Sequence, residues 1–213
     1  MKIALIGATG NAGSRILNEA LARNHYVLAL ARDPSKLQLR PQLTVKKADV
    51  SGNEWGEALK GQDVLVSAFN PPRGTPNYAI AAKSAYRRIV DNAKRFGVKR
   101  FLMVGGAGSL FAPGTTTPLV DTPNFPPEYK IEASAFRDIL QELKNEKELD
   151  WVFISPSAFF SPGERKGHFR IGSDTLLVDE KGKSSISMED FAIAVLDEIE
   201  KPAHHRQRFT VGY

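Results

Sequence analysis

The sequence has 213 residues, of which 42% are hydrophobic and 25% are charged, as in an ordinary globular protein rather than a disordered or collagenous chain. Because it contains no cysteine, thiol catalysis, thiolate-bound zinc, iron–sulfur clusters and disulfides are excluded. The net charge of +5 comes from 29 basic and 24 acidic residues, and the basic residues are scattered rather than gathered in runs, which argues against a nucleic-acid partner.

Short apolar segments alternate with segments of helical periodicity from the N-terminus onward. The run 3–6 ends at a glycine and predicts a strand buried on both faces of a sheet. Apolar residues between Ile16 and Leu21 recur at helical spacing and predict the first helix, and 27–31 is a second buried strand. Residues 1–31 are therefore expected to form a β-α-β unit with a right-handed crossover.

The same alternation continues to the C-terminus. Further strands are expected at 43–45, 64–66, 101–104, 151–154 and 209–211, and helices at 55–59, 78–93, 136–143 and 191–199. Ser187 and Asp190 have the spacing of a capping box at the start of the last helix. We predict a single domain over 1–213 with an α/β fold, a doubly wound, mostly parallel sheet flanked by helices.

Two stretches rich in Gly, Pro, Ser and Thr interrupt the alternation, at about 107–127 and 157–185. Each follows the carboxyl end of a predicted strand, where open α/β sheets place their ligand loops, so both are expected to be substrate-facing insertions. Within the second, 174–179 and 183–187 flank a Glu-Lys-Gly sequence and indicate a small hairpin.

The first predicted βα turn contains three glycines at regular spacing, which favours a dinucleotide-binding (Rossmann) turn. In such a turn the first glycine makes the tight bend, the second lets the backbone approach a pyrophosphate, and the third allows close contact between helix and strand. The free amides and the dipole at the helix start then attract the phosphates. The candidate cofactor-binding residues here are Gly7, Thr9, Gly10, Asn11, Ala12 and Gly13.

The end of the second predicted strand bears on the choice between NAD(H) and NADP(H). An acid there would bind the ribose hydroxyls, whereas a basic residue would accept the 2′-phosphate. Asp33 precedes Pro34 in the arrangement of an N-cap, so backbone amides are expected to occupy its carboxylate. Arg32, helped by Lys36, is then left to face the ribose, although Arg32 could instead be a solvated surface charge. We predict NADP(H) in preference to NAD(H).

Several motifs resemble those of the atypical short-chain dehydrogenase/reductases: Gly7-Ala8-Thr9-Gly10, Arg32-Asp33, Ala48-Asp49-Val50 and Val98-Lys99-Arg100. Three longer segments are similar to the bacterial NADH-flavin reductase branch of that family, and to NmrA-like and biliverdin reductase B-like proteins: Val104 to Leu110, Ser155 to Phe160 and Ser184 to Ser187. The likeness covers nearly the whole chain, and it implies an NAD(P)-binding oxidoreductase with a Rossmann fold.

The resemblance also implies that four segments at strand carboxyl ends surround the cofactor. They are Asp49 and Val50 at the adenine, Ala68, Phe69 and Asn70 beneath the adjoining ribose, Gly105 and Gly106 near the nicotinamide half, and Ser155, Pro156, Ser157 and Ala158 around its ring. For Asp49 a capping role is an equal alternative, although Ser51 or Asn53 could cap instead. For Ser157 the alternative is an ordinary turn hydroxyl.

One departure from the wider family bears on the reaction. Typical short-chain dehydrogenases use Tyr-x-x-x-Lys, in which the lysine lowers the pKa of the tyrosine. Here Tyr86 is followed at four residues by Val90 and Tyr129 by Ala133, and the spacing of Tyr78 and Tyr86 is that of core residues. Reduction of a free flavin depends less on a dedicated acid, because the ring delocalises the added charge and positioning supplies much of the rate.

The resulting hypothesis is an NAD(P)H-dependent reductase of free flavins or quinone-like acceptors. Ser109 and Ser157 are its catalytic candidates, Phe111, Phe159 and Phe160 could form an apolar wall for a flat ring, and Tyr129, Arg165 and His168 are further polar candidates. The expected partner is a small aromatic acceptor rather than a nucleic acid or a membrane, and no cluster has metal-ligand spacing. We expect a cytoplasmic monomer or homodimer.

A second hypothesis belongs to another class of protein. In it the chain is a non-catalytic, NmrA-like redox sensor that binds a dinucleotide and reports its state to a protein partner. Differential binding of oxidised and reduced cofactor, without consumption of an acceptor, would distinguish the sensor from the reductase. Sugar-nucleotide epimerisation is disfavoured because that chemistry relies on the tyrosine that is absent here.

Overall fold

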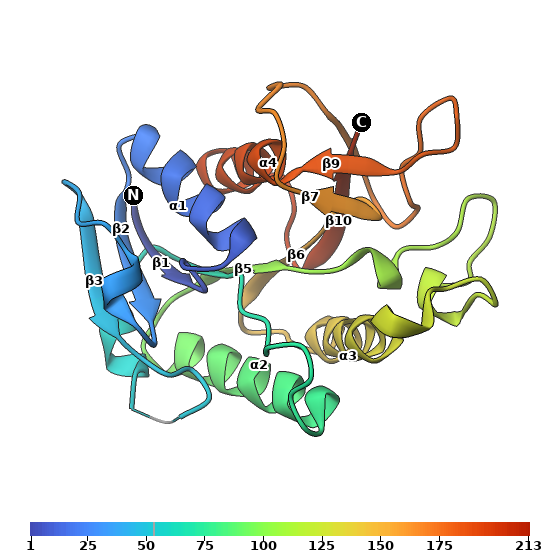
Figure 1. Cartoon of the computed structure of the whole chain (residues 1–213). Helices are drawn as coiled ribbons and strands as arrows, with labels where there is room; N and C mark the ends of the chain where they lie inside the picture. Colours follow the sequence, from blue (N-terminus) through green and yellow to red (C-terminus); the bar gives the residue numbers. More distant parts are fainter. Residues whose placement is uncertain (53) are drawn as a thin grey trace.

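The computed structural model describes residues 1–52 and 54–213. In this part of the chain, eight strands form one sheet (Figure 1). Their order across the sheet is β3 (Leu43–Lys47), β2 (Tyr26–Ala31), β1 (Lys2–Ile6), β4 (Val64–Ser67), β5 (Arg100–Val104), β6 (Asp150–Ser155), β10 (Gln207–Gly212) and β8 (Arg170–Gly172). Each strand predicted from the sequence is present, with ends within two residues of those expected.

The sheet is mostly parallel, as predicted. The only antiparallel pair among the described strands of this sheet is β10 with β8; all the other neighbours run in the same direction. Because β1 has β2 on one side and β4 on the other, the strand order reverses there. In doubly wound sheets such a switch point places the ligand at the carboxyl ends of the strands.

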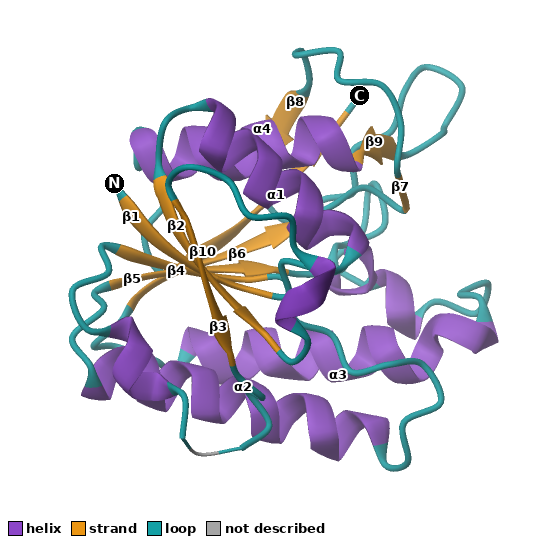
Figure 2. Cartoon of the chain, turned by 60° about the vertical axis from the view of Figure 1, so that its left-hand side comes forward, coloured by secondary structure: helices purple, strands orange, loops and turns teal. Residues whose placement is uncertain are grey.

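Two layers of helices enclose the sheet (Figure 2). Helices α1 (Asn11–Ala22) and α4 (Met188–Glu200) cover one face, and α2 (Tyr78–Arg95) and α3 (Pro127–Lys144) cover the other. The apolar residues that mark the predicted helix, 136–143, lie in the second half of α3, and the helix begins at Pro127, two residues before Tyr129, which was expected to open it. The short helix expected at 55–59 is the 3₁₀ helix η2 (Gly56–Leu59).

Each helical layer packs on its own apolar core. Ile16 and Phe191 belong to the core on the α1/α4 face, and Tyr86 and Phe136 to the core on the α2/α3 face. The central strands are therefore buried on both faces, which explains why they appear in the sequence as continuous apolar runs. No helix in the described ranges is long and apolar enough to span a membrane.

Ion pairs at the surface also join α1 to α4. Arg15 Nε lies 3.0 Å from Glu189 Oε1, and Arg23 Nη1 lies 2.7 Å from Asp197 Oδ1. The side chain of Glu19 accepts hydrogen bonds from both Arg23 and Arg165, so the second insertion is tied to α1 as well.

The start of α4 confirms Ser187 as the predicted N-cap residue and shows a further hydrogen-bond partner there, Tyr213. Ser187 Oγ accepts from the backbone amide of Asp190 at 3.0 Å. The Asp190 carboxylate does not close the capping box on Ser187; it accepts from the Tyr213 hydroxyl at 2.7 Å and from the amide of Gly167. The Ser187 amide donates to the Tyr213 hydroxyl oxygen instead, at 3.2 Å.

The hairpin expected in the second insertion does not form between the predicted segments. A local turn is present, in which the amide of Asp179 donates to the carbonyl of Lys183 at 2.8 Å. However, β9 (Ser185–Ser187) pairs in parallel with β7 (Phe159–Ser161), and the Leu176 amide donates to the carbonyl of Phe111 in the first insertion. Both segments thus find partners distant in the sequence, and a local pattern could not reveal these.

Candidate functional site

A cavity of about 810 Å³ lies at the carboxyl ends of the parallel strands, at the switch point of the sheet. Its lining comes from the ends of β1, β2, β4, β5 and β6, from the start of α1, from α3 and from both insertions. Most of the predicted cofactor residues line it: Gly7, Thr9, Gly10, Asn11, Ala12, Arg32, Val50, Ala68, Phe69, Asn70, Gly105, Gly106, Pro156 and Ala158. Four others, Gly13, Lys36, Asp49 and Ser155, lie outside the lining.

The turn after β1 has no room for side chains at two of its glycines. Gly7 has a φ of 83°, and a Cβ there would lie 2.6 Å from the carbonyl oxygen of Ala68. A Cβ at Gly13 would lie 2.0 Å from the carbonyl oxygen of Gly7. Gly13 therefore acts from behind the cavity, by letting α1 pack tightly against the turn.

The N-terminus of α1 lies at the cavity and has backbone amides without a partner inside the helix. Gly10 is the N-cap residue, it has no side chain to cap the helix, and the first turn contains no acidic residue. The amides of Asn11, Ala12 and Gly13 have no carbonyl partner within the helix, because the first helical bond runs from Ser14 to Gly10. Such a helix end fits an anionic pyrophosphate, which would accept these bonds and be stabilised by the helix dipole.

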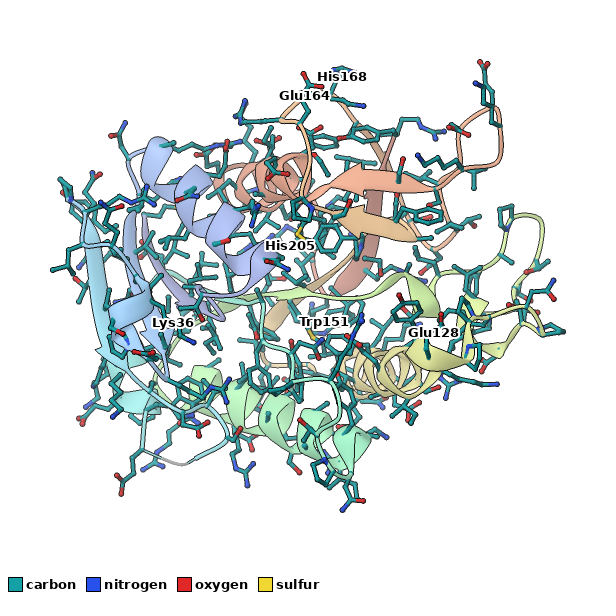
Figure 3. All side chains as sticks on the ribbon, in the orientation of Figure 1. Lys36, Glu128, Trp151, Glu164, His168 and His205 are labelled. Atoms are coloured by element: carbon teal, nitrogen blue, oxygen red, sulfur yellow. The ribbon has the colours of Figure 1, made fainter. Side chains whose placement is uncertain are left out.

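The end of β2 has the arrangement that the sequence predicts. Asp33 caps the 3₁₀ helix η1 (Pro34–Lys36), accepting from the amide and the hydroxyl of Ser35 at 3.1 and 2.6 Å. These hydrogen bonds lower the pKa of Asp33. Arg32 is exposed and lines the cavity, with no ion pair to any described residue. Lys36 is also exposed but lies outside the lining, on the β2/β3 side of the molecule (Figure 3).

Of the two candidate residues after β3, Val50 lines the cavity and Asp49 does not. The side chain of Val50 is buried and lines the cavity together with Ala48, giving an apolar surface for a flat base. Asp49 is exposed, and its carboxylate accepts from the amide of Ser51 at 2.9 Å, which is a local turn contact rather than a helix cap, because the next helix, η2, begins at Gly56 with Trp55 as its N-cap residue. Asn53, the other potential cap, lies outside the described residues.

The opposite end of the cavity is built by the loops after β5 and β6. A Cβ at Gly105 would lie 2.0 Å from the ring of Phe153, whereas a Cβ at Gly106 would meet no atom within 4 Å and would face the cavity. Pro156 and Ala158 line the same end. Ser155 is fully buried, and its hydroxyl oxygen has no hydrogen-bond partner within the described chain.

The two serines expected to be catalytic are both engaged in internal hydrogen bonds. Ser157 lines the cavity, but its buried hydroxyl donates to the carbonyl of Val211 at 2.9 Å. Ser109 lies outside the lining, and its Oγ accepts from Arg208 Nη1 at 3.3 Å. This placement corrects the expectation that Ser109 faces the substrate. The hydroxyl faces Arg208 because that buried guanidinium needs acceptors, and Arg208 also donates to Asp174.

Aromatic side chains cover much of the cavity at the end formed by the loops after β5 and β6. Phe159 and Phe160 line the cavity, whereas Phe111 lies outside it. Phe160 packs on Phe191 with ring centroids 4.8 Å apart, while Phe159 is 64% exposed at the mouth and leaves an open aromatic face. Four further rings in the lining were not predicted as wall residues, namely Phe69, Phe125, Tyr129 and Phe136.

A polar cluster at the mouth joins residues that the sequence does not connect. Arg73, in the loop before α2, lies 3.5 Å from Glu132 on α3, and its guanidinium lies 4.9 Å from the ring centroid of Tyr129. Asn70 donates to Glu132 as well. All four residues line the cavity. Tyr129 was a candidate because it opens a helix beside an insertion, but Arg73 and Glu132 carry no local signal of their meeting.

The other titratable candidates lie away from the cavity. Tyr86 is buried and donates to the carbonyl of Phe69 at 2.8 Å, and burial raises its pKa, which confirms its prediction as a core residue. Burial raises the pKa of Tyr78 in the same way. Arg165 pairs with Glu19, and His168 projects outward from the second insertion beyond α4 (Figure 3).

Comparisons with known proteins agree with this geometry. The family model described as NAD(P)H-binding matches residues 7–202. The uncharacterized protein YwnB of Bacillus subtilis is 44% identical over 213 residues, covering 99% of this chain and 98% of YwnB.

Two crystal structures resemble the chain over its full length. A protein of Bacteroides thetaiotaomicron provisionally named an epimerase is 47% identical, with a TM-score of 0.92 over 100% of this chain and 96% of its own. A protein of Streptococcus pneumoniae provisionally named an NADH-flavin reductase is 36% identical, with a TM-score of 0.89 over 100% and 99%. The glycine-rich turn with its uncapped helix, the doubly wound sheet and the family match agree, and the chain belongs to the NAD(P)H-binding family of atypical short-chain dehydrogenase/reductases.

Proposed function

We propose that the protein is an NADPH-dependent reductase of free flavins or similar quinone-like acceptors. The observation that carries the proposal is the continuity of one cavity, from the bare amides of α1 to an aromatic end containing the exposed ring of Phe159. Such a cavity fits a dinucleotide along the strand ends and a flat ring beyond it. The name of the Streptococcus pneumoniae relative supports the same reaction class.

The side-chain chemistry of the aromatic end favours hydride transfer to a flavin over epimerisation. The hydroxyl of Ser157 is held by a backbone carbonyl, and Tyr129 has no lysine four residues later. A bound NADPH supplies a hydride, and the flavin takes one further proton from solvent to give NADP⁺ and dihydroflavin. The residues of the aromatic end then act by stacking and by excluding water, which position the acceptor for the transfer.

A preference for NADPH over NADH is part of the proposal. Arg32 lines the cavity at the end of β2, while the neighbouring Asp33 carboxylate is occupied by Ser35. A 2′-phosphate would therefore meet an available guanidinium and no competing acid. We further propose a cytoplasmic location and a monomeric or homodimeric state, which cell fractionation and sedimentation would test.

One assay tests the reaction and the cofactor together. NADPH or NADH oxidation is followed with FMN, FAD, riboflavin and a soluble quinone, for the wild type and for Arg32→Ala. We expect flavin-dependent turnover with NADPH, and a KM for NADPH that rises about tenfold in the variant, equal to about 1.4 kcal/mol, with the KM for NADH unchanged.

Each part of this proposal has its own contrary result. Failure of every acceptor to be reduced would refute the reductase, and calorimetric binding of NADP⁺ and NADPH with different affinities would then favour the sensor. Equal KM values for the two cofactors, unmoved by Arg32→Ala, would refute the NADPH preference.

A further inference from the structure

The mouth of the cavity beside α3 carries a guanidinium with unused hydrogen-bonding capacity. Arg73 is 73% exposed, and its contacts with described residues are one long ion pair to Glu132 and the face of Tyr129. A guanidinium has five N–H donors in a planar fork, so most of those of Arg73 are available to a ligand.

Arg73 is presented by a defined turn. The amide of Thr75 donates to the carbonyl of Pro72 at 3.1 Å, and Gly74 has a φ of 81°. A positive φ at the third of four residues is the geometry of a type II turn, which places Arg73 at its tip. The hydroxyl of Thr75 donates to the same carbonyl at 2.6 Å and fixes the turn further.

The carboxylate beside Arg73 does not cancel its attraction for anions. Glu132 is held from a second side by Asn70, and Asn70 in turn accepts from the hydroxyl of Tyr78. Glu132 contacts the guanidinium at Nε, and no described residue accepts a hydrogen bond from its two terminal nitrogens. In the described lining the formal charges are those of Arg32, Arg73 and Glu132, so Glu132 balances Arg73 in charge, and an anion there would be held by directional hydrogen bonds from the remaining N–H donors of the guanidinium.

We propose that Arg73 binds an anionic group carried by the acceptor, so that the acceptor is a phosphorylated flavin such as FMN rather than riboflavin. This inference rests on the proposed reductase function. The phosphates of the dinucleotide are an alternative source of the same chemistry, but the amides of α1 and Arg32 already serve them at another part of the cavity. Arg73 is anchored on Tyr129 and Glu132 of α3, beside the aromatic end.

Binding measurements test the inference independently of turnover. FMN and riboflavin are titrated into the NADP⁺-loaded protein, with quenching of flavin fluorescence as the signal, and NADP⁺ itself is titrated by calorimetry. We expect the wild type to bind FMN about tenfold more tightly than riboflavin, because a charge-assisted Arg–phosphate contact adds to the shared ring stacking. Arg73→Ala should reduce this ratio to about one, with riboflavin and NADP⁺ affinities unchanged.

A matched control comes from a similar pair elsewhere. Arg87 on α2 is also exposed and pairs with a glutamate of α3, Glu142, but neither residue lines the cavity. Arg87→Ala should keep the FMN preference. Because Arg73 and Arg87 are both exposed, neither substitution should affect folding. The wild-type preference should also shrink with salt, since the Debye length falls from about 10 Å at 0.1 M to about 3 Å at 1 M.

Every other outcome overturns the inference. Equal affinities of the wild type for FMN and riboflavin would do so, and so would an FMN preference that survives in Arg73→Ala. A loss of NADP⁺ affinity in Arg73→Ala as large as the loss of FMN affinity would instead assign Arg73 to the dinucleotide. A protein that binds FMN preferentially through Arg73 but oxidises no NADPH would retain the anion site and refute the reductase, so the two failures are distinguishable.

Discussion

At the scale of single residues, Gly13 is the tightest position in the cofactor turn. In Gly13→Ala the new Cβ would lie 2.0 Å from the carbonyl oxygen of Gly7, so α1 or the turn must move. We expect a loss of about 1–3 kcal/mol in the free energy of unfolding, together with weaker NADP⁺ binding because the amides of α1 are displaced. Urea denaturation and calorimetry measure the two effects.

The control for this variant is a glycine-to-alanine substitution at another glycine that lines the same cavity, Gly106. A Cβ at Gly106 would meet no atom within 4 Å, so Gly106→Ala should leave the urea midpoint unchanged. If Gly13→Ala and Gly106→Ala unfolded at the same urea concentration, the packing of α1 on the turn would not require a glycine at position 13.

Residues whose role depends on their immediate neighbours could be predicted, and those with distant partners could not. The cap formed by Asp33 follows from the proline and serine beside it, and the structure has it. Ser109 was misplaced because its partner, Arg208, stands 99 residues further along the chain. Arg73, in the loop before α2, and Glu132, on α3, meet in the same way, and neither segment contains a pattern that predicts the contact.

At the scale of elements, β10 holds the two insertions together. Arg208 on β10 donates to Asp174 in the second insertion at 2.7 Å and to Ser109 in the first at 3.3 Å, and its side chain is almost completely buried. Arg208→Met removes both bonds and leaves the two acceptors without their donor. We expect a loss of about 1–3 kcal/mol in stability and faster proteolysis within 107–127 and 157–185.

The same substitution at an exposed arginine gives the reference for Arg208→Met. Arg87→Met removes a solvent-exposed pair with Glu142 and should change the free energy of unfolding by less than about 1 kcal/mol. Urea titration and limited trypsin digestion compare the two variants. Equal stability and equal cleavage rates would show that Arg208 does not join the insertions.

Elements with a buried periodic face were predictable, whereas elements that begin in solvent were not. The strands were found because both faces of the sheet are covered, which gives apolar runs bounded by glycine and proline. The exposed first turns of α3 carry no such apolar run, and only Tyr129 marked the start of the helix. The pairing of β7 with β9 was missed because it joins segments about 25 residues apart in parallel, a connection that no turn motif marks.

At the scale of the whole molecule, paired carboxylates make the fold sensitive to acid. Burial raises the pKa of Glu19, but hydrogen bonds from Arg165 and Arg23 lower it by more, so the folded-state pKa lies below the ordinary value of 4.5. The folded state therefore binds the proton less readily than the unfolded chain. This contribution to stability is complete above about pH 4.5 and is lost as the pH falls through the folded-state pKa.

Replacing the carboxylate tests the sign of this effect. Glu19→Gln should be less stable than the wild type by about 1–3 kcal/mol near pH 7, and the two unfolding curves should converge in acid. Lys60 also lowers the pKa of Glu57, but both side chains are exposed and screened by solvent, so Glu57→Gln should depart from the wild type far less than Glu19→Gln does. A constant gap between Glu19→Gln and the wild type down to acid pH would contradict the assignment.

The packing of α1 on α4 has a consequence for how the chain is synthesised. Arg15 finds Glu189 174 residues later, so the apolar side of α1 stays uncovered while most of the protein is translated. At about 5–20 residues per second, that interval is roughly 9 to 35 s on the ribosome. We expect this uncovered face of the nascent chain to bind a holdase chaperone until α4 is available, so a chain truncated before Met188 should be captured by a holdase, whereas the folded 213-residue chain should not.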